Sequence, residues 1–345
     1  MYEILHCHTK LSDGELSHKE ILELCLRENI SVIAFTDHDY VPDASIVRGL
    51  KDWKEEKPKW IIGCELSSGL PKELGGKPTS NFHIVGLFIN PFDRNLKSHC
   101  LKVRQGRKLR MEQMVKNMKK LGLKITVQDC LKQAKGETVG RMHIASALKQ
   151  RKENAKVIAK LVKEMALVCK YDPKARKKYQ ELLGATKDQL PYKLFLSKEA
   201  FFKGVFVEHL YLKDMDQTVS LIRKAGGLAI LAHWTFSKDI VGLDLIEKFF
   251  KEKRLDGAEI VFGRPGVDRG LGALNKDMEA MKRLTKKYNM AQAGGPDIHR
   301  KKEFSHFLKD KDFAAKTVGL TNSLLKRQGF VDQKAVFKQI SLSRI

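Results

Sequence analysis

Nine imidazole and carboxylate side chains stand at the ends of short apolar segments or in tight turns, although they are scattered from residue 6 to residue 299. They are His6, His8, Asp13, His38, Glu65, His83, His233, Asp297 and His299. Imidazole and carboxylate are the groups that hold divalent transition metals such as Zn, Mn and Fe in proteins. So many of them in such positions predict a site with more than one metal ion, and therefore a hydrolase.

The local spacing supports this interpretation at two places. His6 and His8 are two residues apart on a predicted strand, so their side chains share one face and can chelate one ion. Cys7 between them points to the opposite face, into the core. A His-x-His pair alone is also common on surfaces and in cores. Glu65 closes a predicted apolar strand, where an unpaired carboxylate is costly unless it binds a cation.

The elements that position these side chains alternate between strand and helix over residues 1–96 and again after about residue 201. Strands are predicted over residues 2–8, 31–36, 60–65, 82–88, 228–232 and 258–262, and in a segment ending at Gly294. Ser17 and Glu20 have the form of a capping box that opens a helix over residues 21–26. Strands separated by helices predict parallel pairing, with the candidate ligands gathered at the carboxyl ends of the strands.

Residues 97–200 have a helical pattern throughout. Helices are predicted over residues 101–121, stopped by Gly122, over 126–133 and over 141–170. The expected fold is therefore an α/β catalytic domain made of residues 1–96 and 201–345, interrupted by an all-helical insertion domain of residues 97–200.

The composition, with 42% hydrophobic residues in a length of 345, is that of a folded globular protein. No apolar run approaches the roughly 20 residues needed to cross a bilayer, so no membrane partner is expected. The chain starts directly with strand-like residues and shows no signal-peptide pattern, which predicts a cytoplasmic protein. Its six scattered cysteines are interpreted as reduced thiols.

The formal net charge of +24 is concentrated in the predicted insertion. Residues 97–200 hold 27 Lys and Arg against 9 Asp and Glu, a net charge of +18. Such a surface predicts a polyanionic partner, most naturally nucleic acid, and a lysine-rich surface that serves only solubility is the alternative. Arg104, Arg107 and Arg110 recur every three residues along one predicted helix, either as a phosphate-binding face or as a solvated one.

The order of the motifs resembles that of the PHP (polymerase and histidinol phosphatase) superfamily of phosphoesterases. The matching elements are HxH…D at His6, His8 and Asp13, TDHD at residues 36–39, GxE ending at Glu65, HxxG beginning at His83, AH ending at His233, and DxH at Asp297 and His299. Two neighbours depart from the family pattern, because Trp234 stands where Pro is usual and Pro296 where Ser is usual.

The resemblance implies a distorted (β/α)7 barrel with three divalent metal ions (Mn, Fe or Zn) at its carboxyl face. The implied sets of ligands are His6, His8, Glu65 and Asp297 for one ion, Glu65, His83 and His233 for a second, and Asp13, His38 and His299 for the third. Glu65 would then bridge two ions. Asp37 is expected to orient His38 or another imidazole, and a solvated turn carboxylate is the alternative.

A helical insertion between the HxxG and AH elements is similar to one branch of the family, which contains nucleoside 3′,5′-bisphosphate phosphatases and 5′→3′ exonucleases of short RNA. Arg141 and His143 look like the Arg-x-His motif of that insertion, whose side chains contact substrate phosphate. An ordinary solvated helix face is the alternative for such a pair on its own. The implied activity is hydrolysis of phosphate esters of nucleotides or short RNA or DNA, through hydroxide from metal-activated water.

Two other functions fit part of the pattern. One is a small-metabolite phosphatase of the histidinol-phosphatase type, against which the basic insertion argues. The other is a non-catalytic nucleic-acid-binding PHP protein, against which the full set of ligands argues. Glu259 is interpreted as a partner of a ligand or as a carboxylate without a role, and Trp234 and Phe236 as candidates for stacking on a base. The remaining histidines, His18, His99, His209 and His306, are interpreted as surface or loop residues.

Overall fold

The computed structural model describes residues 1–75, 82–134, 138–185, 189–265 and 271–327. Within them the chain divides into two compact units, one made of residues 1–103 and 212–345 and the other of residues 104–211. The first unit contains an eight-stranded sheet in the order β1-β2-β3-β4-β6-β7-β8, with β5 paired to β3. The strands are β1 Tyr2–Ile4, β2 Ile30–Phe35, β3 Lys59–Gly69, β4 Phe82–Leu87, β5 Lys213–Asp214, β6 Leu228–Leu231, β7 Gly257–Val261 and β8 Ala291–Gly294.

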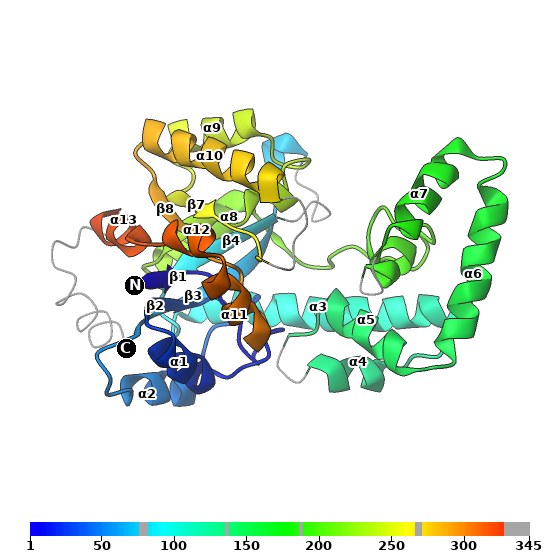
Figure 1. The fold of residues 1–345 in the computed structure, drawn as a ribbon, viewed down its shortest axis with the longest axis horizontal. Helices are drawn as coiled ribbons and strands as arrows, with labels where there is room; N and C mark the ends of the chain where they lie inside the picture. Colours follow the sequence, from blue (N-terminus) through cyan, green and yellow to red (C-terminus); the bar gives the residue numbers. More distant parts are fainter. Residues whose placement is uncertain (76–81, 135–137, 186–188, 266–270, 328–345) are drawn as a thin grey trace. The chain divides into compact units, whose positions relative to one another are not determined.

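Helices cover this sheet, so the α/β class predicted from the sequence is confirmed. Helix α1 packs against β2, α8 against β6 and α10 against β7 (Figure 1). The helices of the first unit are α1 His18–Arg27, α2 Ala44–Lys51, α8 Met215–Lys224, α9 Leu243–Lys251, α10 Leu271–Lys287, α11 Lys301–Lys309, α12 Lys311–Ala315 and α13 Leu320–Arg327. The predicted capping box at Ser17 and Glu20 opens α1. On α9, Phe249 and Phe250 are buried, and burying one such side chain stabilises the fold by about 1.5–3 kcal/mol.

The prediction of parallel pairing is wrong for one strand. β4 runs antiparallel to both β3 and β6, whereas the pairs β1–β2, β2–β3, β6–β7 and β7–β8 are parallel. The described residues between β3 and β4 contain a single 3₁₀ turn, Lys72–Leu74, and no α-helix. A strand that follows without a helical crossover pairs antiparallel. The start of β4, and His83 with it, therefore lies beside the carboxyl ends of β3 and β6.

Two predicted strands have different bounds. Regular pairing of β1 stops at Ile4, and the residues after it bond to the segment after β8, with Leu5 N donating to Gly294 O at 3.2 Å and His8 N to Ile298 O at 2.8 Å. The two ends of the strand path are thereby joined through backbone hydrogen bonds. Glu65 does not end β3, because this strand continues to Gly69 in its pairing with β4 and β5.

The second unit contains helices and turns and no strand among its described residues, which agrees with the predicted all-helical insertion. Its elements are most of α3 Arg94–Lys120, then α4 Val127–Ala134, α5 Arg141–Gln150, α6 Asn154–Val168, α7 Pro173–Leu183 and a π-helix at Tyr192–Leu196. It has its own apolar core, separate from that of the first unit, with Met114, Leu148 and Phe195 among its buried side chains. The unit begins and ends later than the predicted bounds of 97 and 200, and independent folding of the insertion stays a prediction.

The prediction of a single helix over residues 141–170 is wrong, because the helical conformation is interrupted between α5 and α6. Arg151 leaves the helical conformation and pairs with Asp129 through two nitrogens. The side-chain amide of Asn154 donates to Leu148 O at 3.0 Å, a carbonyl that a continuous helix would use, and also to Lys124 O at 2.9 Å, outside that segment.

Three histidines interpreted from the sequence as surface or loop residues are buried. The ring of His18 packs against that of Phe35 with the two planes inclined by 51°, His99 lies within α3, and His209 contacts Arg110. Other elements of the fold pack over these three side chains, and such burial cannot be predicted from the local sequence. The six cysteines are free thiols and all are buried. None of the helices that the structure describes is both long and apolar enough to cross a membrane.

Candidate metal centre

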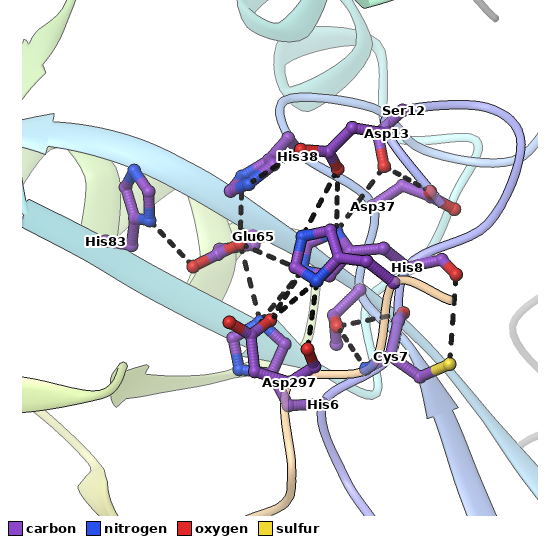
Figure 2. A network of polar contacts seen from close by, with 12 residues as sticks. His6, Cys7, His8, Ser12, Asp13, Asp37, His38, Glu65, His83 and Asp297 are labelled. Carbon is purple, nitrogen blue, oxygen red and sulfur yellow. Dashed lines mark hydrogen bonds and ion pairs between the residues drawn. The ribbon is translucent and has the colours of Figure 1, made fainter. Parts of the chain in front are cut away.

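The nine candidate ligands all belong to the first unit and come together in space. The segments that carry them follow β1, β2, β6 and β8, lie within β3, or lie at the start of β4. Among the described residues their ligand atoms form four groups within 4.8 Å: His8, Asp13, His38 and His299; His6, Glu65 and His233; His6, His8 and Asp297; and His38, Glu65 and His83. Figure 2 shows most of these side chains pointing toward one another. Their role as ligands stays a prediction.

Glu65 is the centre of this cluster and is fully buried. Its neighbours come from strands remote in the sequence (Figure 2). Its two oxygens lie 2.7–3.4 Å from nitrogens of five imidazoles, with His83 and His233 on Oε1 and His6, His8 and His38 on Oε2. Each oxygen therefore faces its own set of nitrogens, which is the arrangement that a carboxylate bridging two cations needs.

The four groups differ in part from the three sets of ligands that the family resemblance implies. The set of Asp13, His38 and His299 is joined by His8, whose ring stacks on that of His299 with a centroid distance of 4.1 Å. His83 and His233 both approach Glu65 but share no group among the described residues. The assignment of three ions to three sets of residues stays a prediction.

The donor atoms of the cluster fit divalent cations. In two of the histidines, the ring nitrogen Nδ1 points away from the cluster. Nδ1 of His6 lies 2.7 Å from Glu259 Oε1, and Nδ1 of His299 lies 2.9 Å from the carbonyl oxygen of Asp297. These acceptors hold the proton on Nδ1, so that Nε2 presents a lone pair to the cluster, as metal-binding histidines do. Within the described residues, the buried atoms Glu65 Oε2 and Asp297 Oδ1 accept no hydrogen bond.

Glu259 contacts two candidate ligands at once from β7, and it is buried. Besides His6 Nδ1, it accepts the backbone N–H of His233 at 2.6 Å through Oε2. His233 has a φ of 23°, in the left-handed region that is unfavourable for a non-glycine residue. The carboxylate thus holds one ring and one strained backbone in place. Sequence reasoning left Glu259 open, although it stands on an apolar strand just as Glu65 does.

Asp37 is buried outside the cluster and contacts Ser12, on the side of His8, and its role in orienting an imidazole stays a prediction. It accepts hydrogen bonds from Thr9 N and Oγ1, both at 2.8 Å, and from Ser12 Oγ at 2.6 Å. Ser12 Oγ is 3.4 Å from His8 Nδ1. The turn that carries Asp13 requires glycine at its end, because a Cβ on Gly14 would lie 2.3 Å from the carbonyl oxygen of His8.

The electrostatics of the cluster keep its carboxylates ionised. Burial alone would raise the pKa of Glu65, but the charges of His38 and His83 outweigh it and hold this pKa well below its usual range. Burial alone would lower the pKa of His8, but the adjacent carboxylates of Asp297 and Glu65 raise it to about 10. Ionised carboxylates are the form that binds cations.

The two residues predicted to bind substrate phosphate, Arg141 and His143, lie in the second unit on the first turn of α5. Arg141 Nη1 donates to Leu196 O at 3.2 Å, and its guanidinium lies 5.8 Å from the ring centroid of Tyr192. His143 Nδ1 accepts the backbone N–H of Gly140 at 2.9 Å, so a neutral ring carries its proton on Nε2 and can donate from there.

Arg141 lines a cavity together with Arg107 and Arg110 of α3. Arg110 is only 5% exposed, donates to Val207 O at 2.6 Å, and contacts His209 at 3.0 Å. The interpretation of these arginines as a solvated face is therefore wrong for Arg110. Burial, with the nearby guanidinium of Arg141, lowers its pKa to about 9. These guanidinium groups concentrate positive charge in this part of the second unit.

Comparisons with known proteins agree with this geometry. Residues 5–189 match the model of the PHP domain. The chain is 25% identical over 296 residues to a 5′-3′ exoribonuclease of Haemophilus influenzae, covering 86% of this chain and 89% of the relative. It is 23% identical over 299 residues to a 3′,5′-nucleoside bisphosphate phosphatase of Chromobacterium violaceum, covering 86% of each. The fold resembles that of a candidate metal-dependent phosphoesterase of Bifidobacterium adolescentis, with a TM-score of 0.64 and 18% identity over 96% of this chain and 98% of the other.

Proposed function

Because the chain belongs to the PHP domain family of metal-dependent phosphoesterases, we propose that it hydrolyses phosphate esters of nucleotides or short nucleic acids. The observation that carries the proposal is the cluster around Glu65, in which buried imidazole and carboxylate atoms face one another. Two relatives whose names specify nucleotide or RNA substrates match most of this chain's length. The activity would be that of a bisphosphate-nucleotide phosphatase or of a 5′→3′ exonuclease.

The nine clustered residues would hold three divalent ions, of Mn, Fe or Zn. Such ions supply hydroxide near neutral pH and neutralise the charge of phosphate oxygens. Glu65 would lie between two of them, and Glu259 would keep Nε2 of His6 directed at the cluster. Asp37, through Ser12, would fix the turn that carries Asp13.

The second unit would bind a terminal phosphate or a nucleic-acid strand. Arg141 can give a planar pair of N–H donors to a phosphate, and His143 presents Nε2 from the same helical turn. The net charge of +18 in residues 97–200 would attract a second phosphate or a nucleic-acid strand. A small metabolite with a single phosphate has no need of such a surface.

A panel of substrates tests the proposal. Protein loaded with Mn is offered adenosine 3′,5′-bisphosphate, 5′-phosphorylated RNA and DNA oligomers, and histidinol phosphate. We expect release of phosphate from the bisphosphate, or of mononucleotides from the oligomers, at a kcat/KM well above that for histidinol phosphate. Preference for histidinol phosphate would establish the metabolite phosphatase instead, and no hydrolysis of any of them would overturn the proposal.

Replacing Arg141 with alanine should weaken the binding of phosphorylated substrates. We expect KM for the nucleotide or oligomer to rise about 10-fold or more, since a hydrogen bond to a charged group contributes about 1.5–3 kcal/mol. Initial rates over a range of substrate concentrations measure the change. The matched control is Arg176→Ala, because Arg176 also donates to backbone carbonyls, those of Cys169 and Lys170, but does not line the cavity. Equal KM values for the two variants would contradict this role of Arg141.

Replacing Glu259 with glutamine should lower metal affinity by about 10- to 100-fold, because a group that orients a ligand imidazole typically contributes that much. Equilibrium dialysis followed by elemental analysis measures the metal content. Glu3→Gln is the matched control. Glu3 is also a buried carboxylate that accepts several bonds, from Gly319 N and Thr321, but its partners are not candidate ligands. Full metal binding by Glu259→Gln would show that this carboxylate does not orient His6.

A further inference from the structure

Phe236 stands beside the candidate metal centre and is 56% exposed. It is the one exposed aromatic ring among the described residues of the first unit. It belongs to the short 3₁₀ helix Trp234–Phe236, which directly follows His233. The two rings meet edge to face, with centroids 5.7 Å apart and planes inclined by 61°. An aromatic surface is thus open to solvent next to one of the nine clustered side chains.

The residues around Phe236 are firmly held, so its exposure does not come from a loosely packed loop. Asp277 of α10 accepts from Thr235 Oγ1 at 2.5 Å and from Lys238 Nζ at 3.1 Å, and these two contacts bracket Phe236 in the chain. Trp234 is buried and its indole N–H donates to Val241 O at 2.6 Å. Trp234 is therefore unavailable for stacking on a base, and of the two candidates only Phe236 has an exposed ring.

His233 lies where the cluster opens to solvent. Its side chain is 13% exposed, and the side chains of His38 and His83 are exposed to similar extents. The side chains of His6 and His8 are fully buried. A phosphate entering the cluster would arrive on this open side. In a nucleotide one sugar separates the phosphate from the base, so the base would then lie near the residues that border the opening, of which Phe236 is one.

We infer that Phe236 is a specificity-determining residue, which stacks on the nucleobase of the substrate whose phosphate is cleaved. The inference rests on the proposed function and narrows it to esters that carry an aromatic base. Stacking of a base on an aromatic side chain tolerates any base, because every base has a π-face. A ring held in place before binding loses little conformational freedom when the base arrives.

The test compares two substrates that differ only in the base. They are adenosine 3′,5′-bisphosphate and its base-free analogue, 1-deoxyribose 3,5-bisphosphate, and kcat/KM is measured for wild type, Phe236→Ala and Phe236→Trp. We expect Phe236→Ala to lower kcat/KM for the adenosine compound by about 10-fold or more, since removing one such stacking interaction costs about 1–3 kcal/mol. The base-free compound should be cleaved equally by all three proteins. Phe236→Trp should retain the preference for the base.

Calorimetric titration with adenosine monophosphate and with ribose 5-phosphate gives a readout that does not depend on turnover. Val318→Ala is the matched control, since Val318 is 54% exposed and adjoins Thr317, which bonds to Glu3 at the amino end of the sheet. Suppose that the wild type cleaves both bisphosphates, and that Phe236→Ala either lowers kcat/KM by the same factor for both or leaves both values unchanged. The stacking inference is then wrong, while the proposed phosphoesterase activity stands. If the wild type cleaves neither, nor any other phosphate ester, the proposed function itself fails.

Discussion

Replacing Glu65 with glutamine should remove the two metal ions that this carboxylate would share, and with them the phosphoesterase activity. The substitution keeps the shape of the side chain but removes the negative charge that faces five imidazoles at 2.7–3.4 Å. It also puts an N–H₂ group, which cannot bind a cation, in place of one carboxylate oxygen. Cations in such sites supply several kcal/mol to the reaction, and a loss of about 4 kcal/mol corresponds to a decrease of about 1000-fold in kcat/KM.

Elemental analysis and initial rates on the same preparations measure this effect, and circular dichroism checks that the variant is folded. Glu23→Gln provides the control, because Glu23 lies exposed on α1 and forms a surface pair with Lys19. Such pairs contribute little to stability. A folded Glu65→Gln protein with the metal content and rate of the wild type would disprove the central role of Glu65.

Removal of metal by a chelator should abolish activity and lower the thermal stability of the wild-type protein by about 10 °C. A ligand present at about 1000 times its dissociation constant stabilises the folded state by about 4 kcal/mol. For a domain of about 150–250 residues, each kcal/mol shifts Tm by about 2–4 °C. Several bound ions would add their effects. Without them, the buried oxygens of Glu65 and Asp297 lose the cations that their positions suit.

Differential scanning calorimetry before chelation, after chelation and after addition of Mn measures the shift. Activity and Tm should recover together on addition of the metal. The Glu65→Gln variant serves as an internal control, since a protein that has lost two of its three ions should show a smaller shift in Tm with either treatment. A wild-type Tm that is the same with and without chelator would mean that the cluster does not bind metal tightly.

Much of the fold could be predicted because local sequence reports secondary structure directly. The capping box at Ser17 and Glu20 opens α1 as expected, and the strand predicted over residues 31–36 is β2, Ile30–Phe35. The direction of β4 could not be obtained in this way. It depends on the absence of an α-helix between β3 and β4, whereas the prediction assumed that every strand is separated from the next by a helix.

The candidate site shows the same division. His6, His8 and Asp297 could be selected from the sequence because imidazole and carboxylate beside apolar strands are costly unless they have partners. The residues that contact these ligands could not be selected from the sequence. That Glu259 bonds to His6 and to the backbone of His233 depends on the pairing of β6 with β7, and no local pattern encodes the contact.

Burial of charged and aromatic side chains in the rest of the molecule was likewise beyond local reasoning. Arg110 lies on a basic helix whose sequence is compatible with a solvated face, yet Val207 and His209, about a hundred residues away, cover and bond it. Trp234 and Phe236 are two residues apart and have similar chemistry, but one is buried and the other exposed.

Residue type and hydrophobic period are local properties of the chain, so they reveal which chemical groups are present and on which elements they stand. Which of these groups come into contact depends on the folded arrangement of the elements. The convergence of strands at one edge places Glu65 among five imidazoles, leaves Phe236 open beside His233, and gathers three arginines of the helical unit around one cavity. Such meetings arise from the pairing and packing of segments remote in the sequence, which is why they appear only in the folded molecule.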